Sequence, residues 1–245
     1  MERKFPLKLT RSGKLSGKRC EALEAEFLAI QNNLKEKISC TDSFQMQNLK
    51  TVAGVDLAYW KENQKEFAVC CIVVLDYATG QILEKQQFHD EIKVPYMPGF
   101  LAFRELPLIL ETVKLLQIQP DLYIFDGNGY LHPRHMGIAS HAGILLNKPS
   151  IGVAKTYYRV FDAEYSEPEQ IAGSYTDIVI QGEVYGRVLR THANVKPVFL
   201  SVGTGICLDT ATEIIQHFVT KDSHIPAPTR LADLETHTAR RAILG

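Results

Sequence analysis

Three carboxylates occupy positions that a folded protein usually gives to apolar side chains. Glu105 lies in a segment with helical periodicity, and all its neighbours three and four residues away are apolar. Asp126 ends the apolar run LYIF, and Asp56 interrupts the strand-like run TVAGVDLAY. Because an ionised carboxylate is costly to bury without a compensating cation, one shared divalent ion would explain all three acids together.

An acidic cluster of this kind would bind Mg²⁺ or Mn²⁺ and act on phosphate esters. All-oxygen ligation selects hard cations, which keep several waters and bind substrate phosphates. Carboxylate sites that hold one or two such ions are a recurring solution for phosphodiester hydrolysis. Each acid also has a purely structural explanation: Glu105 at the edge of its apolar stripe, Asp126 in a tight turn, and Asp56 on the wet side of an edge strand. The spacing of the residues leaves both explanations open.

The apolar patterning predicts the elements that must position these acids. Three strand-like segments come first, and Ala78-Thr79-Gly80 between the second and third suits a hairpin turn. Helical and strand-like segments then alternate. We expect strands at 51–60, 66–77, 81–92, 121–126, 149–155, 176–181, 184–191 and 197–203, and helices at 17–48, 99–117, 135–147, 211–220 and 230–243. This order predicts an α/β fold in which helices flank a mixed sheet.

The length of 245 residues fits one large domain or two small ones, and because no repeat or low-complexity linker divides the chain, we expect a single globular domain over residues 1–245. Hydrophobic residues make up 45% of the chain and charged residues 22%. No apolar run reaches the length of about 18 residues that a membrane helix needs, and no apolar stretch follows the basic start as in a secretion signal. Five cysteines form no CxxC pair, which favours free thiols in a reducing compartment. We therefore expect a cytoplasmic protein without a membrane partner.

Charge is distributed unevenly along the chain. The net charge of −1 by itself argues against a polyanionic partner. Residues 1–19, however, hold seven basic side chains against Glu2 alone, so this segment carries +6 and residues 20–245 carry −7. The basic N-terminal arm, residues 1–16, would either contact phosphates or remain a solvated, flexible terminus.

Five spaced motifs resemble those of the endonuclease V family. The match runs through most of residues 50–240, and chance does not produce so many motifs at consistent spacing. The motifs are VAGVD with Asp56, PYMPGFLAFRE with Tyr96 and Glu105, DGNGYLHPRHMGIASHAGILL with Asp126 and His132, PSIGVAKT with Lys155, and PTRLAD with Asp233.

The resemblance implies a ribonuclease-H-like sheet, in which three antiparallel strands are followed by parallel strands. It also implies that Asp56 and Asp126 bind Mg²⁺, which Mn²⁺ can replace, and that Glu105 completes the acidic cluster. Asp233 would supply a fourth carboxylate, from the last helix. Such an ion activates water for in-line attack on phosphorus and stabilises the leaving oxygen.

Two further side chains gain a catalytic role from the resemblance. Lys155 would place its positive charge against the phosphate as negative charge develops there. His132 would position a water or contact the phosphate. Taken alone, a lysine at a strand end is usually solvated and a histidine before proline is usually a loop residue.

The segment Pro95-Tyr96-Met97-Pro98 resembles a wedge that separates nucleic-acid strands. The prolines stiffen the backbone, so the tyrosine ring is presented at low entropic cost and can offset lost base stacking. The family more often has isoleucine at the position of Met97. The methionine keeps the apolar volume of that side chain but is more flexible. The alternative is a proline-bounded loop with a buried tyrosine.

A flipped lesion base would need a pocket that accepts hypoxanthine and rejects adenine. Hypoxanthine offers an O6 acceptor and an N1–H donor, and adenine reverses both, so a fixed site leaves buried groups unpaired with adenine. In the family, backbone groups around glycines recognise the base. The positions that match are Gly99, Leu101, Gly127, Gly129, Ile138 and Gly152.

The expected function is therefore a magnesium-dependent endonuclease that recognises a deaminated purine. It would cut 3′ to the lesion, one nucleotide beyond it, leave 3′-hydroxyl and 5′-phosphate ends, and serve DNA repair. The alternatives are a ribonuclease-H-like nuclease that prefers RNA inosine or branched or flap structures, and an inosine-binding protein without turnover. The expected partner is nucleic acid, either DNA containing deoxyinosine or RNA containing inosine, bound by a monomer.

Overall fold

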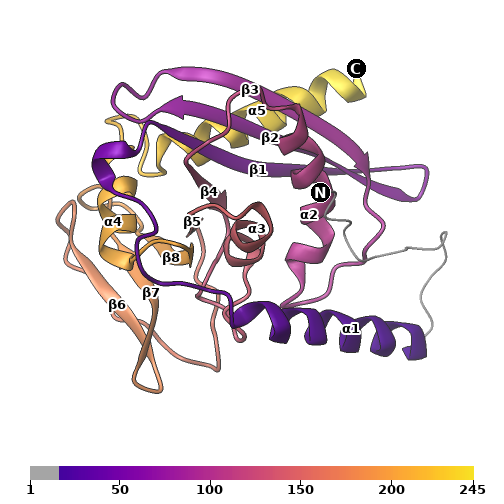
Figure 1. Cartoon of the computed structure of the whole chain (residues 1–245), viewed down its shortest axis with the longest axis horizontal. Coiled ribbons are helices and arrows are strands. Elements are labelled where there is room, and N and C mark those ends of the chain that lie inside the picture. The colour runs from indigo at the N-terminus through magenta and orange to yellow at the C-terminus, as the bar shows by residue number, and fades with distance from the viewer. Residues whose placement is uncertain (1–16) are drawn as a thin grey trace.

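The apolar runs of the sequence form the strands of one mixed sheet (Figure 1). The computed structural model describes residues 17–245, so the basic arm expected at 1–16 lies outside the described residues. β1, β2 and β3 pair antiparallel, β4 and β5 continue parallel to β1, and the remaining strands pair antiparallel. Across the sheet the order is β3 (Ile82–Glu91), β2 (Lys65–Asp76), β1 (Thr51–Glu62), β4 (Leu122–Asp126), β5 (Ser150–Ala154), β8 (Val198–Thr204), β7 (Glu183–Leu189) and β6 (Tyr175–Ile180).

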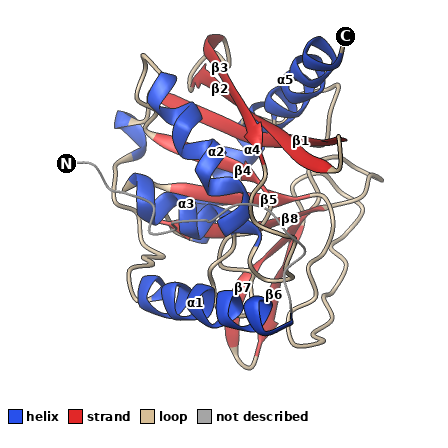
Figure 2. Ribbon diagram, turned by 90° about the vertical axis from the view of Figure 1, so that its right-hand side faces the viewer, coloured by secondary structure: helices blue, strands red, loops and turns tan. Residues whose placement is uncertain are grey.

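Helices cover both faces of this sheet (Figure 2). α2 and α3 bury their apolar side chains against one face, α4 and α5 against the other, and α1 packs against the start of α2. The expected α/β fold with a mixed sheet flanked by helices is confirmed. None of the helices in the described range has the length and apolar composition to cross a bilayer. The helices are α1 (Gly17–Lys35), α2 (Leu101–Leu115), α3 (Ile138–Leu146), α4 (Leu208–His217) and α5 (Ala227–Leu244), with a short 3₁₀ turn η1 (Met46–Asn48).

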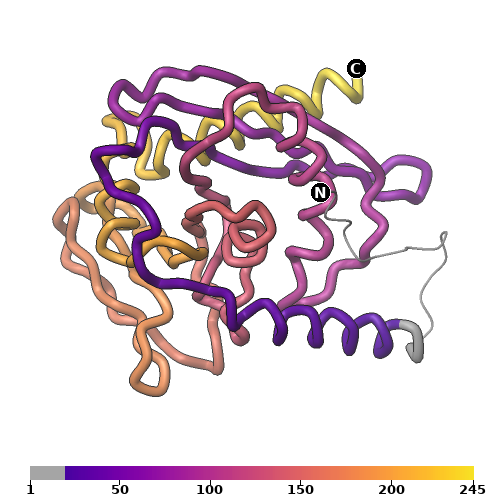
Figure 3. Tube along the Cα trace, in the orientation of Figure 1, coloured from indigo at the N-terminus to yellow at the C-terminus, as the bar shows by residue number. Residues whose placement is uncertain are grey.

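Strand β1 separates the two halves of the core. Ala53 and Val55 face α2 and α3, whereas Val52 belongs to the cluster that includes α4 and α5. Gly54 points the same way as Val52, and a β-carbon there would lie 2.0 Å from the carbonyl oxygen of Pro228. Only glycine therefore lets the start of α5 approach β1 so closely. Figure 3 shows the result, with the last helix lying along strands from the first third of the chain.

The first helix is shorter than the sequence predicts. The expected helix at 17–48 was wrong beyond Lys35, where α1 ends. Backbone groups of the following segment instead bond to the end of β8: Ser39 N–H donates to Thr204 Oγ1, and Ser43 N–H donates to the carbonyl of Gly205. These tertiary hydrogen bonds replace the helical ones.

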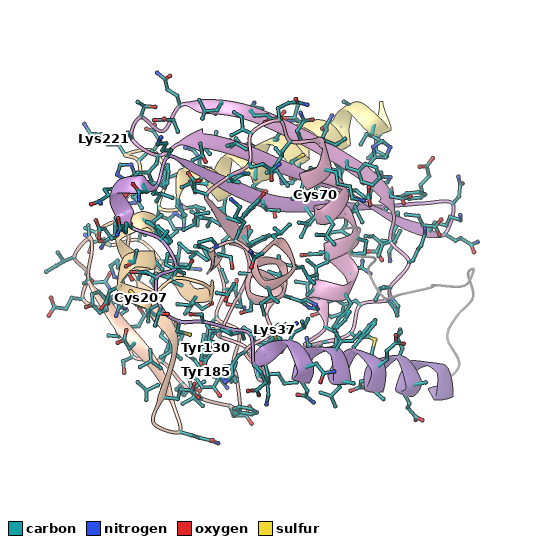
Figure 4. All side chains as sticks on the ribbon, in the orientation of Figure 1. Lys37, Cys70, Tyr130, Tyr185, Cys207 and Lys221 are labelled. Atoms are coloured by element: carbon teal, nitrogen blue, oxygen red, sulfur yellow. The ribbon has the colours of Figure 1, made fainter. Side chains whose placement is uncertain are left out.

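The five cysteines are free thiols, as predicted. Cys70 and Cys71 are both buried and point to opposite faces of β2, one toward α2 and the other toward α5. Figure 4 shows Cys70 and Cys207 in well-separated parts of the fold.

Candidate active site

Asp56 and Asp126 lie side by side where β4 ends. β1 and β4 are parallel neighbours whose last paired residues are Val55 and Phe125, so the next residue of each strand is an aspartate. β1 is an interior strand, so the edge-strand explanation for Asp56 is wrong. The segment after Asp126 leads to α3 rather than to a second hairpin strand, so the turn explanation is wrong as well.

Two further charged side chains reach this point from other elements. Lys155 directly follows β5, and its Nζ lies 2.7 Å from Asp126 Oδ2 and 3.4 Å from Asp233 Oδ2. Asp233 comes from α5, where His237 one turn later places Nε2 3.3 Å from Asp233 Oδ1. Four elements that are distant in sequence thus bring three carboxylates and one ammonium group together.

The electrostatics of Asp56 show that one lysine does not balance these acids. Burial, followed by the charge of Asp126, raises the pKa of Asp56 to about 8, and Asp233 adds to this effect. A backbone hydrogen bond and Lys155 act in the opposite direction. Additional positive charge at this position would favour the ionised form of Asp56.

Glu105 approaches from the opposite face of the sheet. It is buried on α2, with 8% of its surface exposed, so the explanation that it reaches water at the edge of the stripe is wrong. The Tyr59 hydroxyl donates a hydrogen bond of 2.5 Å to Glu105 Oε1. Burial raises the pKa of Glu105 to about 7, while the hydrogen bond from Tyr59 and the charge of Arg104 lower it and the charge of Asp126 raises it. Arg104 itself pairs with Glu66 at 2.6 Å, so Glu105 has no direct cationic partner within residues 17–245.

The acids suit a hard cation, although they do not form a closed ligand set. No three His, Cys, Asp or Glu side chains within residues 17–245 are already arranged to hold an ion, and the group in contact with Asp126 is the Lys155 ammonium. The donors are carboxylate oxygens alone, which is the chemistry that Mg²⁺ and Mn²⁺ prefer. Burial and like charge both disfavour ionised Asp56, and a divalent ion would reverse that effect. Asp56 and Asp126 therefore fit as ligands, with Glu105 behind them.

The segment that follows Asp126 forms part of the wall of a small cavity through Asn128. The volume of this cavity is about 130 Å³, which suits one heterocyclic base rather than a whole nucleotide. A larger hollow of about 870 Å³, near the ends of α1 and α3, contains none of the predicted site residues. The small cavity is lined by Tyr96, Gly99, Leu101, Ala102, Asn128, His132, Met136, Gly137, Ile138 and Tyr158.

The proline-bounded segment at the mouth of this cavity presents its tyrosine to solvent. Tyr96 is 68% exposed, so the buried-tyrosine alternative is wrong, and both Pro95 and Pro98 are exposed. Met97 is buried instead, in a cluster with aromatic side chains of α1 and α2. The methionine thus anchors the segment, and the tyrosine ring remains available at the surface.

Three side chains hold the carbonyl of Gly99 next to this segment. Gln31 Nε2 lies 3.0 Å from it, Arg134 Nη2 2.9 Å and His132 Nε2 3.1 Å. The backbone N–H of Arg134 donates to His132 Nδ1, so Nε2 carries the ring proton and donates it to Gly99. Burial lowers the pKa of His132 to about 3, with the charge of Arg134 in the same direction. Because both ring nitrogens are engaged, the geometry favours a positioning role for His132 over contact with a phosphate or a water.

Buried neutral histidines lead to a prediction about stability. Burial lowers the pKa of His141, on α3, to about 4, whereas an unfolded histidine titrates near pH 6.5. Below that pH the unfolded chain binds protons that the folded chain excludes, so stability is complete above pH 6.5 and is lost as the pH falls toward 4. We expect His141→Gln to reduce this loss by up to about 1.4 kcal/mol per pH unit, measured by urea unfolding between pH 7 and 5. His89→Gln, at an exposed position of β3, should keep the wild-type slope; equal slopes in all three proteins would contradict the assignment.

The six residues predicted to recognise the base divide into two groups. Gly99, Leu101 and Ile138 line the cavity as expected of base-recognition residues, whereas among the described residues Gly127, Gly129 and Gly152 do not. A β-carbon at Gly152 would lie 2.6 Å from both the Gly127 carbonyl oxygen and the Gly129 amide nitrogen. Gly152 therefore lets the segment after Asp126 lie directly on β5, and Gly129 lets the same segment approach β8, where a β-carbon would lie 2.2 Å from the Val202 carbonyl oxygen.

Sequence reasoning missed two polar side chains of the cavity. Asn128 was considered only as part of the turn-like DGNG, and Tyr158 was not considered. Tyr158 stacks on His132, with ring centroids 6.0 Å apart and planes 11° apart. The available signal was the pair Tyr157-Tyr158, which follows Lys155 closely in the sequence. The direction of the Tyr158 ring, however, depends on the path of the loop after β5.

Comparisons with known proteins show which proteins this chain is similar to. The family model described as Endonuclease V matches residues 32–234. Endonuclease V of Bacillus thuringiensis subsp. konkukian is 56% identical over 219 residues, 89% of this chain and 93% of the relative. The crystal structure of Endonuclease V from Bacillus subtilis has a TM-score of 0.88 at 49% identity, covering 90% of this chain and 93% of that one. Endonuclease V of Ciona intestinalis, in complex with a 24mer DNA containing an inosine followed by a ribo-adenosine, has a TM-score of 0.82 at 28% identity, covering 91% and 99%.

Proposed function

This chain belongs to the endonuclease V family and is a nuclease, and on that premise we propose that it is a magnesium-dependent endonuclease acting on deaminated purines. It recognises inosine or deoxyinosine and hydrolyses the phosphodiester bond one nucleotide beyond the lesion on its 3′ side. The products carry 3′-hydroxyl and 5′-phosphate ends, and the reaction serves DNA repair. The observation that carries the proposal is the convergence of Asp56, Asp126, Asp233 and Lys155, together with a cavity that fits one base and that Asn128, two residues after Asp126, helps to line.

The acidic residues hold the metal in this proposal. Asp56 and Asp126 supply carboxylate oxygens, and Glu105, oriented by the Tyr59 hydroxyl, completes the set. When bound, Mg²⁺ (or Mn²⁺) supplies an activated water and charge stabilisation for phosphodiester hydrolysis. Lys155 contributes a positive charge that attracts the phosphate and offsets negative charge developing on it. Asp233 holds Lys155 within reach of this position.

The cavity receives the flipped base, and the proline-bounded segment holds the strands apart. Gly99, Leu101 and Ile138 offer backbone groups at the cavity wall, and His132 fixes the Gly99 carbonyl through its Nε2–H. Tyr96 is exposed at the mouth, where its flat ring can stack on the base step that the lesion leaves. Base recognition in the cavity and hydrolysis at the acidic residues thus take place at two positions. The cavity selects strands that carry the lesion, while the acidic residues act on a phosphate further along the strand.

Two questions about the substrate and setting follow. The Ciona relative was crystallised with a strand in which ribose follows inosine, so preference between deoxyribose and ribose has to be measured for this chain. A nuclease with preference for RNA inosine or for branched or flap structures is the alternative proposal. We also propose a monomer in the cytoplasm, since one chain supplies every site residue and its cysteines are unpaired.

The test is a cleavage assay on short strands that differ at one base. With Mg²⁺ we expect the wild-type protein to cut an inosine-containing strand one nucleotide 3′ of the lesion, and to leave the adenine strand intact. Asp56→Ala should cut neither strand. A matched pair with deoxyribose or ribose around the inosine measures the sugar preference. Cutting without lesion preference would support the structure-specific alternative, and binding without cutting would support an inosine-binding protein.

A further inference from the structure

One residue of the cavity wall carries a buried side-chain oxygen that the described part of the chain leaves without a hydrogen bond. Asn128 lines the cavity, and its Oδ1 is enclosed without a hydrogen-bond partner among the residues that the structure describes. An asparagine in a turn usually bonds a neighbouring backbone group through this oxygen, which does not happen here. Because a buried polar atom without a partner is unfavourable, this arrangement points to a partner that arrives with a ligand.

The backbone of Asn128 is held more firmly than its side chain. Ala139 N–H donates a hydrogen bond of 3.1 Å to the Asn128 carbonyl. A β-carbon at Gly137 would lie 2.2 Å from that carbonyl oxygen, and one at Gly152 would lie 2.8 Å from the Asn128 carbonyl carbon. Gly137 and Gly152 therefore let the backbone pack closely around the Asn128 peptide on two sides. The Asn128 side chain thus extends from a fixed backbone position at the cavity wall.

Starting from the proposed function, on which this inference rests, we propose that the Asn128 side chain hydrogen-bonds the edge of the flipped base. A carboxamide carries one acceptor and two donors in a plane. Hypoxanthine carries the complementary pair on one edge, the N1–H donor beside the O6 acceptor. The amide and this edge can form two parallel hydrogen bonds, as asparagine does with base edges elsewhere.

This contact adds affinity for the base rather than rejection of adenine. No described group holds Oδ1 in one orientation, and a half-turn of the amide exchanges its donor and acceptor. Adenine, with the reverse pair, can therefore also be matched. Rejection of adenine is left to the backbone groups of Gly99, Leu101 and Ile138, which cannot turn. Loss of the Asn128 amide should thus weaken lesion binding without disturbing the fold.

The experiment measures binding to labelled strands by fluorescence anisotropy without divalent metal, so that no cutting occurs. Three strands carry hypoxanthine, adenine or 1-deazapurine, the last having C–H at position 1 and no oxygen at position 6. We expect Asn128→Ala to raise the Kd for the hypoxanthine strand about 10-fold and to leave the Kd for the 1-deazapurine strand unchanged. Asn128→Leu, which keeps the number and branching of the side-chain heavy atoms but has no polar atom, should lose as much as Asn128→Ala. Asn33→Ala, at an exposed position of α1, should bind like wild type.

The outcomes separate this inference from the function on which it rests. If wild type neither binds nor cuts the hypoxanthine strand in preference to adenine, the proposed function fails before any variant is considered. If wild type shows that preference but both variants lose affinity equally for the hypoxanthine and 1-deazapurine strands, Asn128 does not contact the base edge. Full affinity in Asn128→Leu would assign the side chain to packing and also overturn the inference.

Discussion

Asp126→Asn is expected to lower the rate of strand cleavage by roughly 10³-fold or more while the protein stays folded. The substitution keeps the size of the side chain and removes one negative charge from the centre of the site. The substitution removes the ion pair with Lys155, whose Nζ lies 2.7 Å from Asp126 Oδ2. It also removes the negative charge that raises the pKa of Asp56. These two effects oppose each other, so the free energy of unfolding without metal should change little.

Metal-dependent stability provides the second readout for Asp126. An ion that binds only the folded chain raises the unfolding temperature as its concentration increases. Wild type should show this rise with Mg²⁺, and Asp126→Asn should lose most of it. Glu213→Gln, an exposed carboxylate on α4, serves as the control and should keep both the cleavage rate and the rise. An Asp126→Asn protein that cuts at more than a tenth of the wild-type rate would remove Asp126 from the metal site.

Gly152→Ala is expected to lower cleavage by about 10²-fold and to destabilise the fold by about 1–3 kcal/mol. The added methyl group would meet the backbone of Gly127 and Gly129 at 2.6 Å, and a peptide backbone cannot rotate away as a flexible side chain can. The segment that begins at Asp126 must therefore move off β5. Because this segment carries Asp126 and Asn128, both the acidic site and the cavity would be displaced.

A second glycine distinguishes displacement of the site from general destabilisation. Gly182 lies in the turn between β6 and β7 with φ of +85°, and a β-carbon there meets nothing within 4 Å. Gly182→Ala should cost about 1–2 kcal/mol through backbone strain, with cleavage by the folded protein unchanged. Urea unfolding and single-turnover cleavage at full folding measure the two effects separately. Equal cleavage rates for the two variants would show that Gly152 acts through stability alone.

Local pattern predicted most of the helices and strands and singled out the three acids. Apolar runs predicted β1 and β2, and the helical spacing around Glu105 placed it on the apolar stripe of α2 but left open whether its carboxylate is buried or reaches water. These features depend on residues close together in the chain, whose periodicity records which face is buried. The resemblance of the motifs then supplied the identity of the family, which composition and periodicity do not contain.

Only the tertiary structure decided where side chains point and which distant segments are in contact. α1 ends at Lys35 because the next backbone groups bond to β8, a partner more than 160 residues away. The sequence places His132 before a proline in a loop, but only the structure shows that its neutral ring is engaged by Gly99 and Arg134. Glu105 and Asp56 are both buried acids, yet they reach the site from opposite faces of the sheet. Residue types and spacing thus determine which groups are available for chemistry, whereas the crossing of distant strands and helices determines which of them meet.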